Sequence, residues 1–476
     1  MKLRPLALST LSALALSACA VGPDYAAPTP RSASSGPFLA VGQPPVTADE
    51  LPADWWRLYE DPVLDTLVAD ALAANTDVRQ AVARIERARA GLRGARSDRL
   101  PQTNIGASGA YSRLPESQSL PGVDREGWGY DVGLDVGYEL DLFGRIGRSV
   151  EAARADLAAS EADADAVRVI VVADTTRAYA DAASGAAQLR VARQIVELLD
   201  QSLALTSRRH DAGLETGLAV AQIRALREQR AAEIPALEAA RQAALFRLAT
   251  LTGRTPAELP PIAGERSVGL EIRNPIPVGD GAALLSRRPD IRAAERRLAA
   301  DTARIGVATA DLYPRITLGA SVGSTGPDIG DVFSGGPLRW VLGPLLDWAF
   351  PNQEPARARI QGAEADVQES LAAFDGRVLL ALEETETALS NYARALERRA
   401  ALQAAAQQAE EAARIIRAQQ REGAVSSLER LDAERTLAET LAQLAEQDAA
   451  IPRAQIDLFR ALGGTWSTSD GASSWS

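Results

Sequence analysis

The chain contains two copies of one sequence unit. Residues 76–79 (TDVR) match residues 289–292 (PDIR) about 210 positions further on, and the ungapped match reaches the GAS triplets at 106–108 and 319–321. Self-similarity at a fixed spacing indicates that one supersecondary unit is built twice. Any structure predicted for one copy must therefore fit the other. We assign the first repeat to residues 76–254 and the second to residues 286–464.

In each repeat, two segments alternate between apolar and polar residues. The clearest is 131–143, where acids and glycines share one face and the other face carries Val132, Leu134, Val136, Tyr138, Leu140 and Leu142. Strict alternation is typical of a β-strand. Weaker alternation predicts three further strands, at 102–111, 316–322 and 339–350, although Pro344 interrupts the last one. Long loops are expected at 112–127 and 324–338.

Strands with one apolar face suit a transmembrane barrel, and a soluble sandwich with one wet face is the alternative. The sandwich is disfavoured because the strands form only two separated pairs among helical segments. Beyond the N-terminal leader there is no apolar run of about 18 residues, so a membrane segment would have to be β. Four strands cannot close a barrel, which needs about eight. Several chains would share one barrel, with eight strands in a dimer or twelve in a trimer.

Each repeat also contains one long and two shorter helical segments. Residues 149–210 and 355–422 are each long enough for a helix of roughly 90 Å. The shorter segments, end to end, match that length in both repeats: 77–100 with 217–250, and 290–312 with 427–462. Stacking two short helices beside each long one would build a tall helical wall, and unconnected coiled-coil hairpins are the alternative. The predicted fold is mainly α, with long antiparallel helical hairpins and a β-barrel part of four strands per chain.

The N-terminus has the features of a secretory leader. Lys2 and Arg4 precede a short apolar stretch, residues 6–18, which is too short to span a bilayer. It ends in LSAC, which resembles a bacterial lipobox and implies cleavage before Cys19 and acylation of its thiol with a lipid such as palmitate. An ordinary signal peptide with a chance cysteine is the alternative, but Cys19 is the only cysteine in the chain. Ala20 resembles the residue that directs lipoproteins to the outer membrane.

The remaining segments are assigned by composition. Proline and glycine cluster between the two repeats, which is typical of a linker. The resulting division is a signal peptide at 1–18, a lipid-anchored surface segment at 19–75, a linker at 255–285 and a C-terminal tail at 465–476.

Composition argues against enzymes and nucleic-acid binders. The net charge of −12 disfavours a nucleic-acid partner. One histidine and one cysteine leave little room for metal or triad chemistry. The histidine, His210, stands in a turn with no Ser or Cys motif beside it. We expect no catalytic residue, no metal and no cofactor apart from the covalent lipid on Cys19.

Several motifs together resemble one known family. They are CAVGPDY at 19–25, WW at 55–56 followed by DPVLD at 61–65, LSRRPDI at 285–291, and LGG at 462–464 before Trp466. The chain resembles the TolC-like outer membrane factors, in their NodT-type lipoprotein branch. The resemblance implies a homotrimer with a twelve-stranded outer-membrane barrel and a periplasmic helical tunnel. It also implies docking to a periplasmic adaptor and an inner-membrane pump, often of the resistance–nodulation–division type, so that the chain is a passive conduit for efflux.

Two helix turns are equivalent in the repeats, at 209–214 (RHDAGL) and 419–424 (QQREGA). A glycine suits a helix end because the left-handed conformation is common there. The resemblance implies that these turns form the tip that contacts the adaptor, through Arg209, Gly213, Leu214, Gly423 and Ala424. The family usually has arginine at the first position of both turns, whereas the second turn here has Gln419.

After the second turn, Leu428 and Asp432 share a helical face, with Glu429 beside them. The resemblance implies that Leu428, Glu429 and Asp432 form the periplasmic gate, and three-fold symmetry would place three copies of Asp432 around one pore. The alternative is an ordinary solvated helix face. Ala219 stands where the family often has aspartate, so a latch using that aspartate cannot form here in the same way.

Two other functions stay open from the sequence. One is the exit duct of type I protein secretion, and the other is a structural outer-membrane lipoprotein with coiled-coil arms and no channel. The alternation in 131–143 favours the channel, because a structural arm needs no lipid-facing strand. Drugs, metals and proteins are all open as cargo.

Overall fold

The computed structural model describes residues 20–29, 34–39, 45–115, 117, 124–272, 274–333, 338–422 and 424–464. The chain divides into two compact units. The sheet unit comprises Met1–Pro28, Arg84–Glu161 and Ala293–Asp375, and the helical unit comprises Thr29–Ala83, Ala162–Arg292 and Gly376–Ser476. Both units therefore draw residues from both halves of the sequence. In the described part of the chain, no helix is long and apolar enough to cross a membrane.

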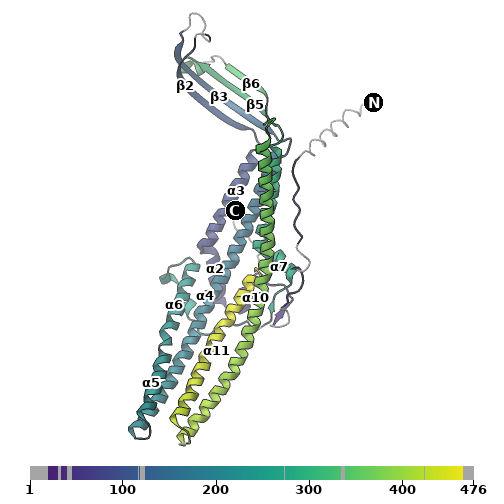
Figure 1. Cartoon of the computed structure of the whole chain (residues 1–476). Helices are drawn as coiled ribbons and strands as arrows, with labels where there is room; N and C mark the ends of the chain where they lie inside the picture. Colours follow the sequence, from purple (N-terminus) through teal and green to yellow (C-terminus); the bar gives the residue numbers. More distant parts are fainter. Residues whose placement is uncertain are drawn as a thin grey trace. The chain divides into compact units, whose positions relative to one another are not determined.

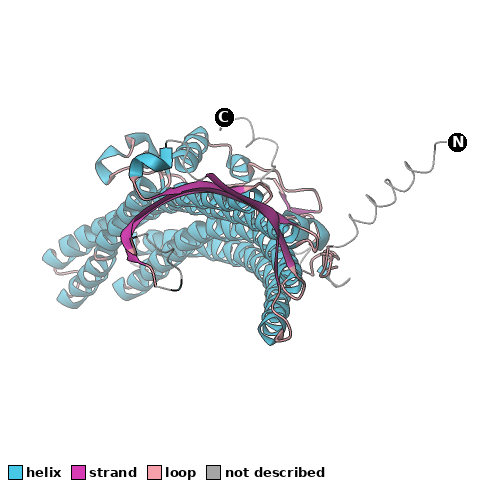
Figure 2. Ribbon diagram, turned by 90° about the horizontal axis from the view of Figure 1, so that it is seen from above, coloured by secondary structure: helices cyan, strands magenta, loops and turns pink. Residues whose placement is uncertain are grey.

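The sheet unit holds a four-stranded antiparallel sheet (Figure 1). Its strands, in spatial order, are β2 (Gln102–Arg113), β3 (Glu126–Leu140), β5 (Arg315–Gly326) and β6 (Leu338–Asp347). The central pair, β3 and β5, joins the first half of the chain to the second. Figure 2 shows that the sheet is strongly curved. Within the described residues, the outer edges of β2 and β6 have no pairing strand.

The register separates the side chains into two faces. On one face, Ile105, Leu134, Val322 and Trp340 lie opposite one another across the four strands. On the other face, the matching row is Asn104, Asp135, Ser321 and Val341. This polar face also carries two rows of glycine, which are Gly106–Gly133–Gly323 and Gly137–Gly319–Gly343. A shallow cavity lies against the polar face and includes Asn104, Asp135 and Ser321 in its lining, so the polar face is the hollowed one.

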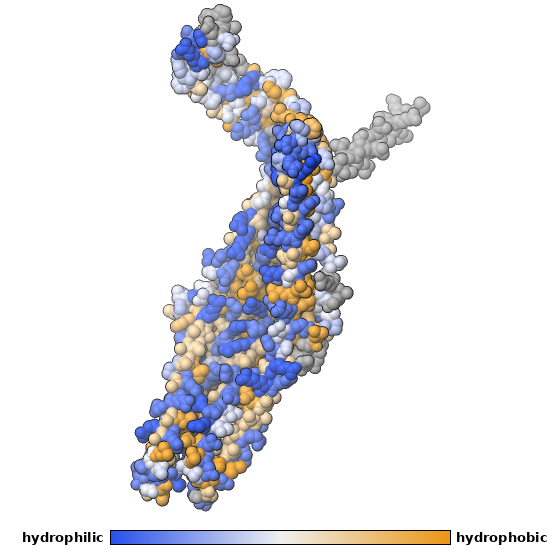
Figure 3. All heavy atoms as spheres, in the orientation of Figure 1, coloured by the Kyte–Doolittle hydropathy of each residue, from blue (hydrophilic) through white to orange (hydrophobic). Residues whose placement is uncertain are grey.

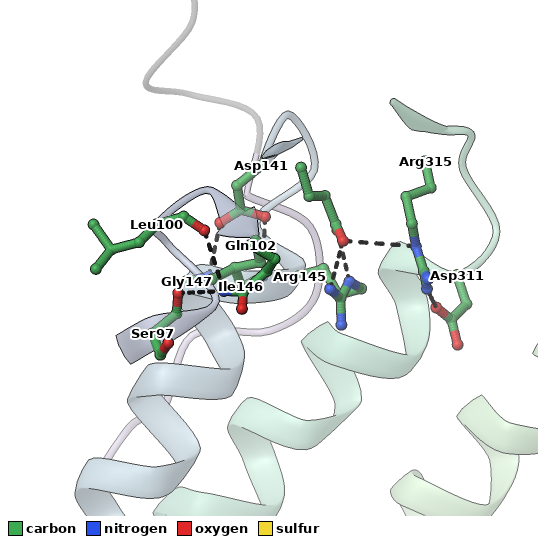
Figure 4. Close-up of polar contacts among 10 residues, drawn as sticks. Ser97, Leu100, Gln102, Asp141, Arg145, Ile146, Gly147, Asp311 and Arg315 are labelled. Atoms are coloured by element: carbon green, nitrogen blue, oxygen red, sulfur yellow. Dashed lines mark hydrogen bonds and ion pairs between the residues drawn. The ribbon is translucent and has the colours of Figure 1, made fainter. Parts of the chain in front are cut away.

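The strands lie close to their predicted positions, but β3 begins and ends earlier than predicted. The segment predicted as 131–143 is paired from Glu126 to Leu140. It stops there because the Asp141 carboxylate accepts hydrogen bonds from the backbone N–H groups of Ile146 (2.9 Å) and Gly147 (2.7 Å), as Figure 4 shows. Asp141 therefore caps the next helix, and a capped helix start ends the strand pattern. Pro344 does not end the last strand, because β6 stays paired with β5 on both sides of it, and Pro344 itself lies opposite Leu318.

The two long helices are α4 (Arg145–Asp211) and α10 (Glu354–Arg421), and each contributes residues to both units. The shorter helices are α2 (Pro62–Ala74), α3 (Thr76–Ser97), α5 (Gly217–Ala231), α6 (Glu233–Leu251), α7 (Gly281–Arg287), α8 (Pro289–Ala310), α9 (Ile329–Phe333) and α11 (Ser427–Ala461). Short elements complete the described chain: β1 (Val46–Thr47), η2 (Trp55–Tyr59), η4 (Pro256–Glu258), η5 (Pro261–Gly264) and β4 (Ile276–Pro277).

One predicted helix is divided in two. Residues 217–250 were expected to be continuous, but α5 ends at Ala231 and α6 begins at Glu233. Pro235 explains the break, because proline has no N–H to donate to the carbonyl four residues earlier. Within the first turn of α6 that missing donor costs little.

The helical unit buries parts of both predicted connecting segments. Leu64, Leu67, Val68 and Ala71 form the buried face of α2, at the spacing of one helix face. Trp55 stacks on Phe459 with ring centroids 4.5 Å apart. The segment 19–75, predicted to lie on the surface, thus contributes to the core, as do Leu270, Ile276 and Val278 of the predicted linker.

Candidate functional site

The two predicted tip turns have the same backbone pattern. In the first, the Leu214 N–H donates to the Arg209 carbonyl (2.8 Å), and in the second the Ala424 N–H donates to the Gln419 carbonyl (2.9 Å). Both bonds join residues five apart, which is the pattern of a left-handed helix C-cap. Gly213 has a φ of +74° and open space around it, so its conformation rather than crowding requires glycine. Gly423 lies outside the described residues.

The helix after the second turn begins with a capping box. The Ser426 side chain accepts from the Glu429 N–H, while the Glu429 carboxylate accepts from the Ser426 N–H (2.7 Å) and hydroxyl (2.9 Å). The hydrogen bonds from Ser426 hold the pKa of the Glu429 carboxyl below its usual value. Glu429, predicted as a gate residue, is therefore engaged in starting α11. In the first turn, Thr216 caps Ala219 (3.2 Å), and no carboxylate completes a box.

Leu428 and Asp432 lie on an exposed face of α11. Leu428 keeps 64% of its surface exposed, and Asp432 is also exposed. Neighbouring positions on the other side of the helix, Arg430 and Leu431, are buried. One helix thus buries one face within the helical unit and leaves the predicted gate face exposed in the single chain.

The buried face is partly apolar. Ile195 and Leu199 of α4 cluster with Ile223 and Leu226 of α5 and with Leu431 of α11. A second cluster joins Ala409 and Ala413 of α10 to Leu437 of α11. Figure 1 shows the α4–α5 and α10–α11 hairpins side by side, and these clusters hold them together.

A buried polar network lies beside these clusters. The Arg430 guanidinium donates to the carboxylate of Glu434 (2.8 Å), to the side-chain carbonyl of Gln420 (2.7 Å) and to the Ser202 hydroxyl. Ser202 also donates to Glu434 (2.5 Å). The network therefore joins α4, α10 and α11 through charged groups that are almost fully buried. Buried ion pairs add little net stability, but leaving one partner alone is costly.

The first turn is tied to the start of α11. The Glu215 carboxylate accepts a hydrogen bond from Ser427 and forms an ion pair with Arg209 (3.4 Å). The His210 ring Nδ1 lies 2.9 Å from the Glu215 carbonyl oxygen. Arg209, a predicted adaptor contact, is therefore engaged within the chain, whereas Leu214 and Ala424 are exposed.

Sequence reasoning missed Arg430, Glu434 and Ser202. Opposite charges four residues apart on a helix normally indicate a solvated pair. The available signal is that Arg430 and Glu434 fall on the same helical stripe as Leu437 and Leu441, which face the core. Charges on an apolar stripe indicate a buried network rather than a surface pair.

The predicted acylation site, Cys19, lies outside the described residues. The next residue, Ala20, lies against Gly144, between β3 and α4. The Val21 N–H donates to the Phe143 carbonyl (3.2 Å). The described chain thus begins at the end of β3 where α4 starts.

Aromatic residues gather at both ends of the strands. At one end, Trp128 contacts Tyr111 and Tyr130, with ring centroids 5.9 and 5.8 Å apart. At the other end, Trp348 stacks on Phe350 (4.7 Å), and Phe143 stacks on Tyr313 (4.5 Å). Between them the strands expose large apolar side chains, among them Ile105, Trp340, Leu342 and Leu346. Figure 3 shows apolar atoms over the part of the sheet where β5 and β6 lie.

Comparison with known proteins agrees with these features. The family model described as outer membrane efflux protein matches residues 67–254 and 282–464. Outer membrane protein OprJ of Pseudomonas aeruginosa is 35% identical over 459 residues, which cover 96% of this chain and 95% of that protein. The antibiotic efflux pump outer membrane protein ArpC of Pseudomonas putida is 29% identical over 384 residues, covering 80% of this chain and 79% of that protein. The structure of the outer-membrane channel OprN matches with a TM-score of 0.87 at 36% identity, over 94% of this chain and 100% of that chain.

Proposed function

Since this chain belongs to the outer membrane efflux protein family, we propose that it is the exit duct of a tripartite efflux system in the outer membrane. It works as a homotrimer, together with a periplasmic adaptor and an inner-membrane pump. The duct is a passive conduit, and the pump supplies the energy and selects the cargo. No step of this function requires catalysis by the chain.

The observation that carries the proposal is the sheet with two open edges. Within the described residues, β2 and β6 pair on one side only, while the apolar face of the sheet is exposed. In a bilayer each unpaired backbone group costs several kcal/mol, so open edges are not tolerated there. Pairing β2 of one copy with β6 of the next removes both edges. Three copies close a twelve-stranded barrel whose glycine-rich polar face lines the lumen.

The dimensions of the strands support this arrangement. From Trp128 to Leu140, β3 rises roughly 40 Å at about 3.4 Å per residue, or roughly 30 Å when tilted by about 40°. The hydrocarbon core of a bilayer is about 30 Å thick. The aromatic groups at the two ends of the strands are then placed at the two membrane interfaces, where tyrosine and tryptophan are enriched.

In the trimer, the α10–α11 hairpins converge to form the periplasmic gate. Leu428 and Asp432 face the axis, and their exposure within one chain supports this because it leaves them accessible to the other copies. Glu429 serves as the helix cap beside the gate. Leu214, Ala424, Gly213 and Gly423 form the tip surface that contacts the adaptor, while Arg209 supports that surface from within through Glu215.

The mature chain is also a lipoprotein, acylated at Cys19. The support is the lipobox-like LSAC segment and the position of Ala20 beside the end of β3, the membrane-facing element. A lipid on Cys19 would enter the bilayer at the interface marked by Phe143 and Tyr313. Mass spectrometry of the mature N-terminus tests this, because an unmodified N-terminus starting elsewhere would exclude acylation.

The trimeric duct is tested by native mass spectrometry in detergent, followed by conductance measurements in planar bilayers. Three chains per particle and ion-conducting pores are expected. A stable monomer that keeps its β-structure in detergent would exclude the shared barrel, since four strands cannot close alone.

A further inference from the structure

The first described residues, 20–25, form a strap that crosses α4 and α8 within the sheet unit. The Val21 N–H donates a hydrogen bond to the Phe143 carbonyl, and the Tyr25 hydroxyl donates to the Glu295 carboxylate on α8. The Tyr25 ring also packs against Ala155 of α4 and against Ala299 and Ala300 of α8. Backbone, polar and apolar contacts therefore fix the strap at several points.

Glycines make the close approach possible. A Cβ on Gly22 would lie 2.5 Å from the Gly306 Cα, and Gly22 itself has a φ of +91°. A Cβ on Gly144, whose φ is +80°, would lie 2.9 Å from the Ala20 Cα. Backbone cannot yield to such contacts, so each position admits only glycine while the strap is docked.

Arg148 supplies the polar part of the docking site. Its side chain is only 8% exposed, yet its guanidinium forms an ion pair with Asp24 at 2.7 Å. The same arginine lies against Gly306, where a Cβ would approach its Cγ to 2.8 Å. Gly306 therefore leaves the space through which Arg148 reaches the strap.

We propose that Gly144, Arg148, Glu295 and Gly306 form a docking site for residues 20–25, and that this site fixes the level at which the N-terminal lipid enters the membrane. The second part rests on the proposed acylation of Cys19. One residue spans about 3.5 Å, so a docked Ala20 would keep a lipid attached one residue earlier within a short distance of the end of β3. Without docking, the free chain from residue 20 to residue 28 would reach roughly 30 Å, and the lipid would no longer be held at one level.

The proposal predicts that the strap docks through its own contacts, without help from the lipid. A spin label on Ala26→Cys reports this, because acylation of Cys19 would leave the new cysteine as the only free thiol. The label should show an immobilised spectral component in the otherwise wild-type trimer. It should remain immobilised when Cys19→Ala is combined with a signal peptide that is cleaved without acylation. Loss of the immobilised component in that variant would overturn the proposal.

Two glycine variants disturb the docking site in different ways. A Cβ on Gly22 would meet the backbone of Gly306, and a Cβ on Gly306 would meet the side chain of Arg148. Gly22→Ala and Gly306→Ala should both abolish the immobilised component, while native mass spectrometry still finds the trimer. Gly94→Ala in α3 is the matched control for Gly306→Ala, since Gly94 is also helical and its added Cβ meets no atom within 4 Å apart from its chain neighbours and its own helix backbone. A label that stays immobilised in either Gly22→Ala or Gly306→Ala would overturn the docking site, and a label freed in both of them but not in Gly94→Ala would support it.

The experiment separates this inference from the acylation. If Cys19 carries no lipid, labelling yields two modified cysteines per chain, and the lipoprotein proposal fails. In the Cys19→Ala background, the glycine variants still test the docking site alone.

Discussion

The two helix turns share a backbone hydrogen-bond pattern but differ in their side chains. Both are closed by a bond between residues five apart, and both are followed by a helix with a hydroxyl cap. The positions after the caps differ, however. Each residue of the first turn has an equivalent 210 positions later in the second: Thr216 corresponds to Ser426, Leu218 to Leu428, Ala219 to Glu429, and Gln222 to Asp432.

The comparison separates the residues that both helix turns require from the residues that occur in the second turn alone. A repeated helix end requires only a left-handed residue and a capping hydroxyl, and both turns provide a hydroxyl cap. At the positions after the caps, carboxylates occur only in the second turn, as Glu429 and Asp432, and the buried arginine and glutamate occur on the helix that follows it. The carboxylates of the proposed gate and the buried ion pair thus lie on α11, and α5 has neither at the equivalent positions.

The largest expected effect concerns the network that anchors α11. Glu434→Leu should lower the free energy of unfolding by about 3–5 kcal/mol, because it leaves the Arg430 guanidinium buried without its carboxylate. The double variant Arg430→Met/Glu434→Leu should recover most of that loss, since apolar replacement of a buried pair is often neutral. Thermal unfolding followed by circular dichroism measures both. A double variant no more stable than Glu434→Leu would contradict a buried pair.

An exposed pair provides the control for that experiment. Arg414 and Glu411 form an ion pair on α10 at 2.6 Å, but both side chains are exposed. Glu411→Leu should leave the unfolding temperature almost unchanged, because an exposed ion pair adds little stability. The difference between the two glutamates then measures burial rather than charge.

The next largest effect is expected from Leu428, the apolar residue of the proposed gate. Burying a leucine contributes about 1.5–3 kcal/mol, so Leu428→Ser should shift the closed–open equilibrium toward open by roughly ten-fold to a hundred-fold. Single-channel recording of purified trimers should show higher conductance. Leu218→Ser is the matched control, since Leu218 is 67% exposed at the equivalent position of α5. Equal effects of the two variants would remove the distinction between the turns.

A smaller effect is expected from the charge of Asp432 in the proposed gate. Asp432→Ala should reduce cation preference or the sensitivity to block by divalent cations, because a ring of carboxylates sets the local potential. Conductance should change less than in Leu428→Ser, since the charge repels its own copies and does not hold the tip closed. Gln222→Asp introduces a carboxylate at the equivalent position of α5. If it alters ion selectivity as strongly as Asp432→Ala does, the pore is not lined by α11 alone.

The sequence predicts those features that depend on local periodicity. The alternation in β3 and the lengths of α4 and α10 are visible in the residues, and so are the two turns, whose glycines and hydroxyl caps act locally. The strand end at Leu140 was misplaced, because Asp141 continues the polar alternation while its carboxylate caps α4. The break before α6 was missed, although Pro235 marks it.

The candidate site was only partly predictable, for a physical reason. The resemblance placed Leu428 and Asp432, and the structure leaves both exposed on one face of α11. The partners of Arg430 come from α4 and α10, far away in the sequence, so no local pattern pairs them. The same resemblance assigns Glu429 to the gate, but its hydrogen bonds to Ser426 depend on the backbone of the turn and were not predicted.

The smallest expected effect concerns the caps, and it depends on pH. The pKa of Glu429 is lowered by hydrogen bonds from Ser426, so the cap stabilises α11 above the ordinary glutamate pKa and is lost as the pH falls through the lowered value. Acidification should therefore reduce hydrogen-exchange protection in the first turn of α11. The first turn of α5 should not respond in this way, because Ala219 replaces the carboxylate. Ala219→Glu should transfer the response to α5. Ser426→Ala should cost about 1 kcal/mol near neutral pH and less once Glu429 is protonated, because the hydroxyl also donates to its carboxylate. If protection in both turns falls in parallel in the wild type, the capping box does not distinguish them.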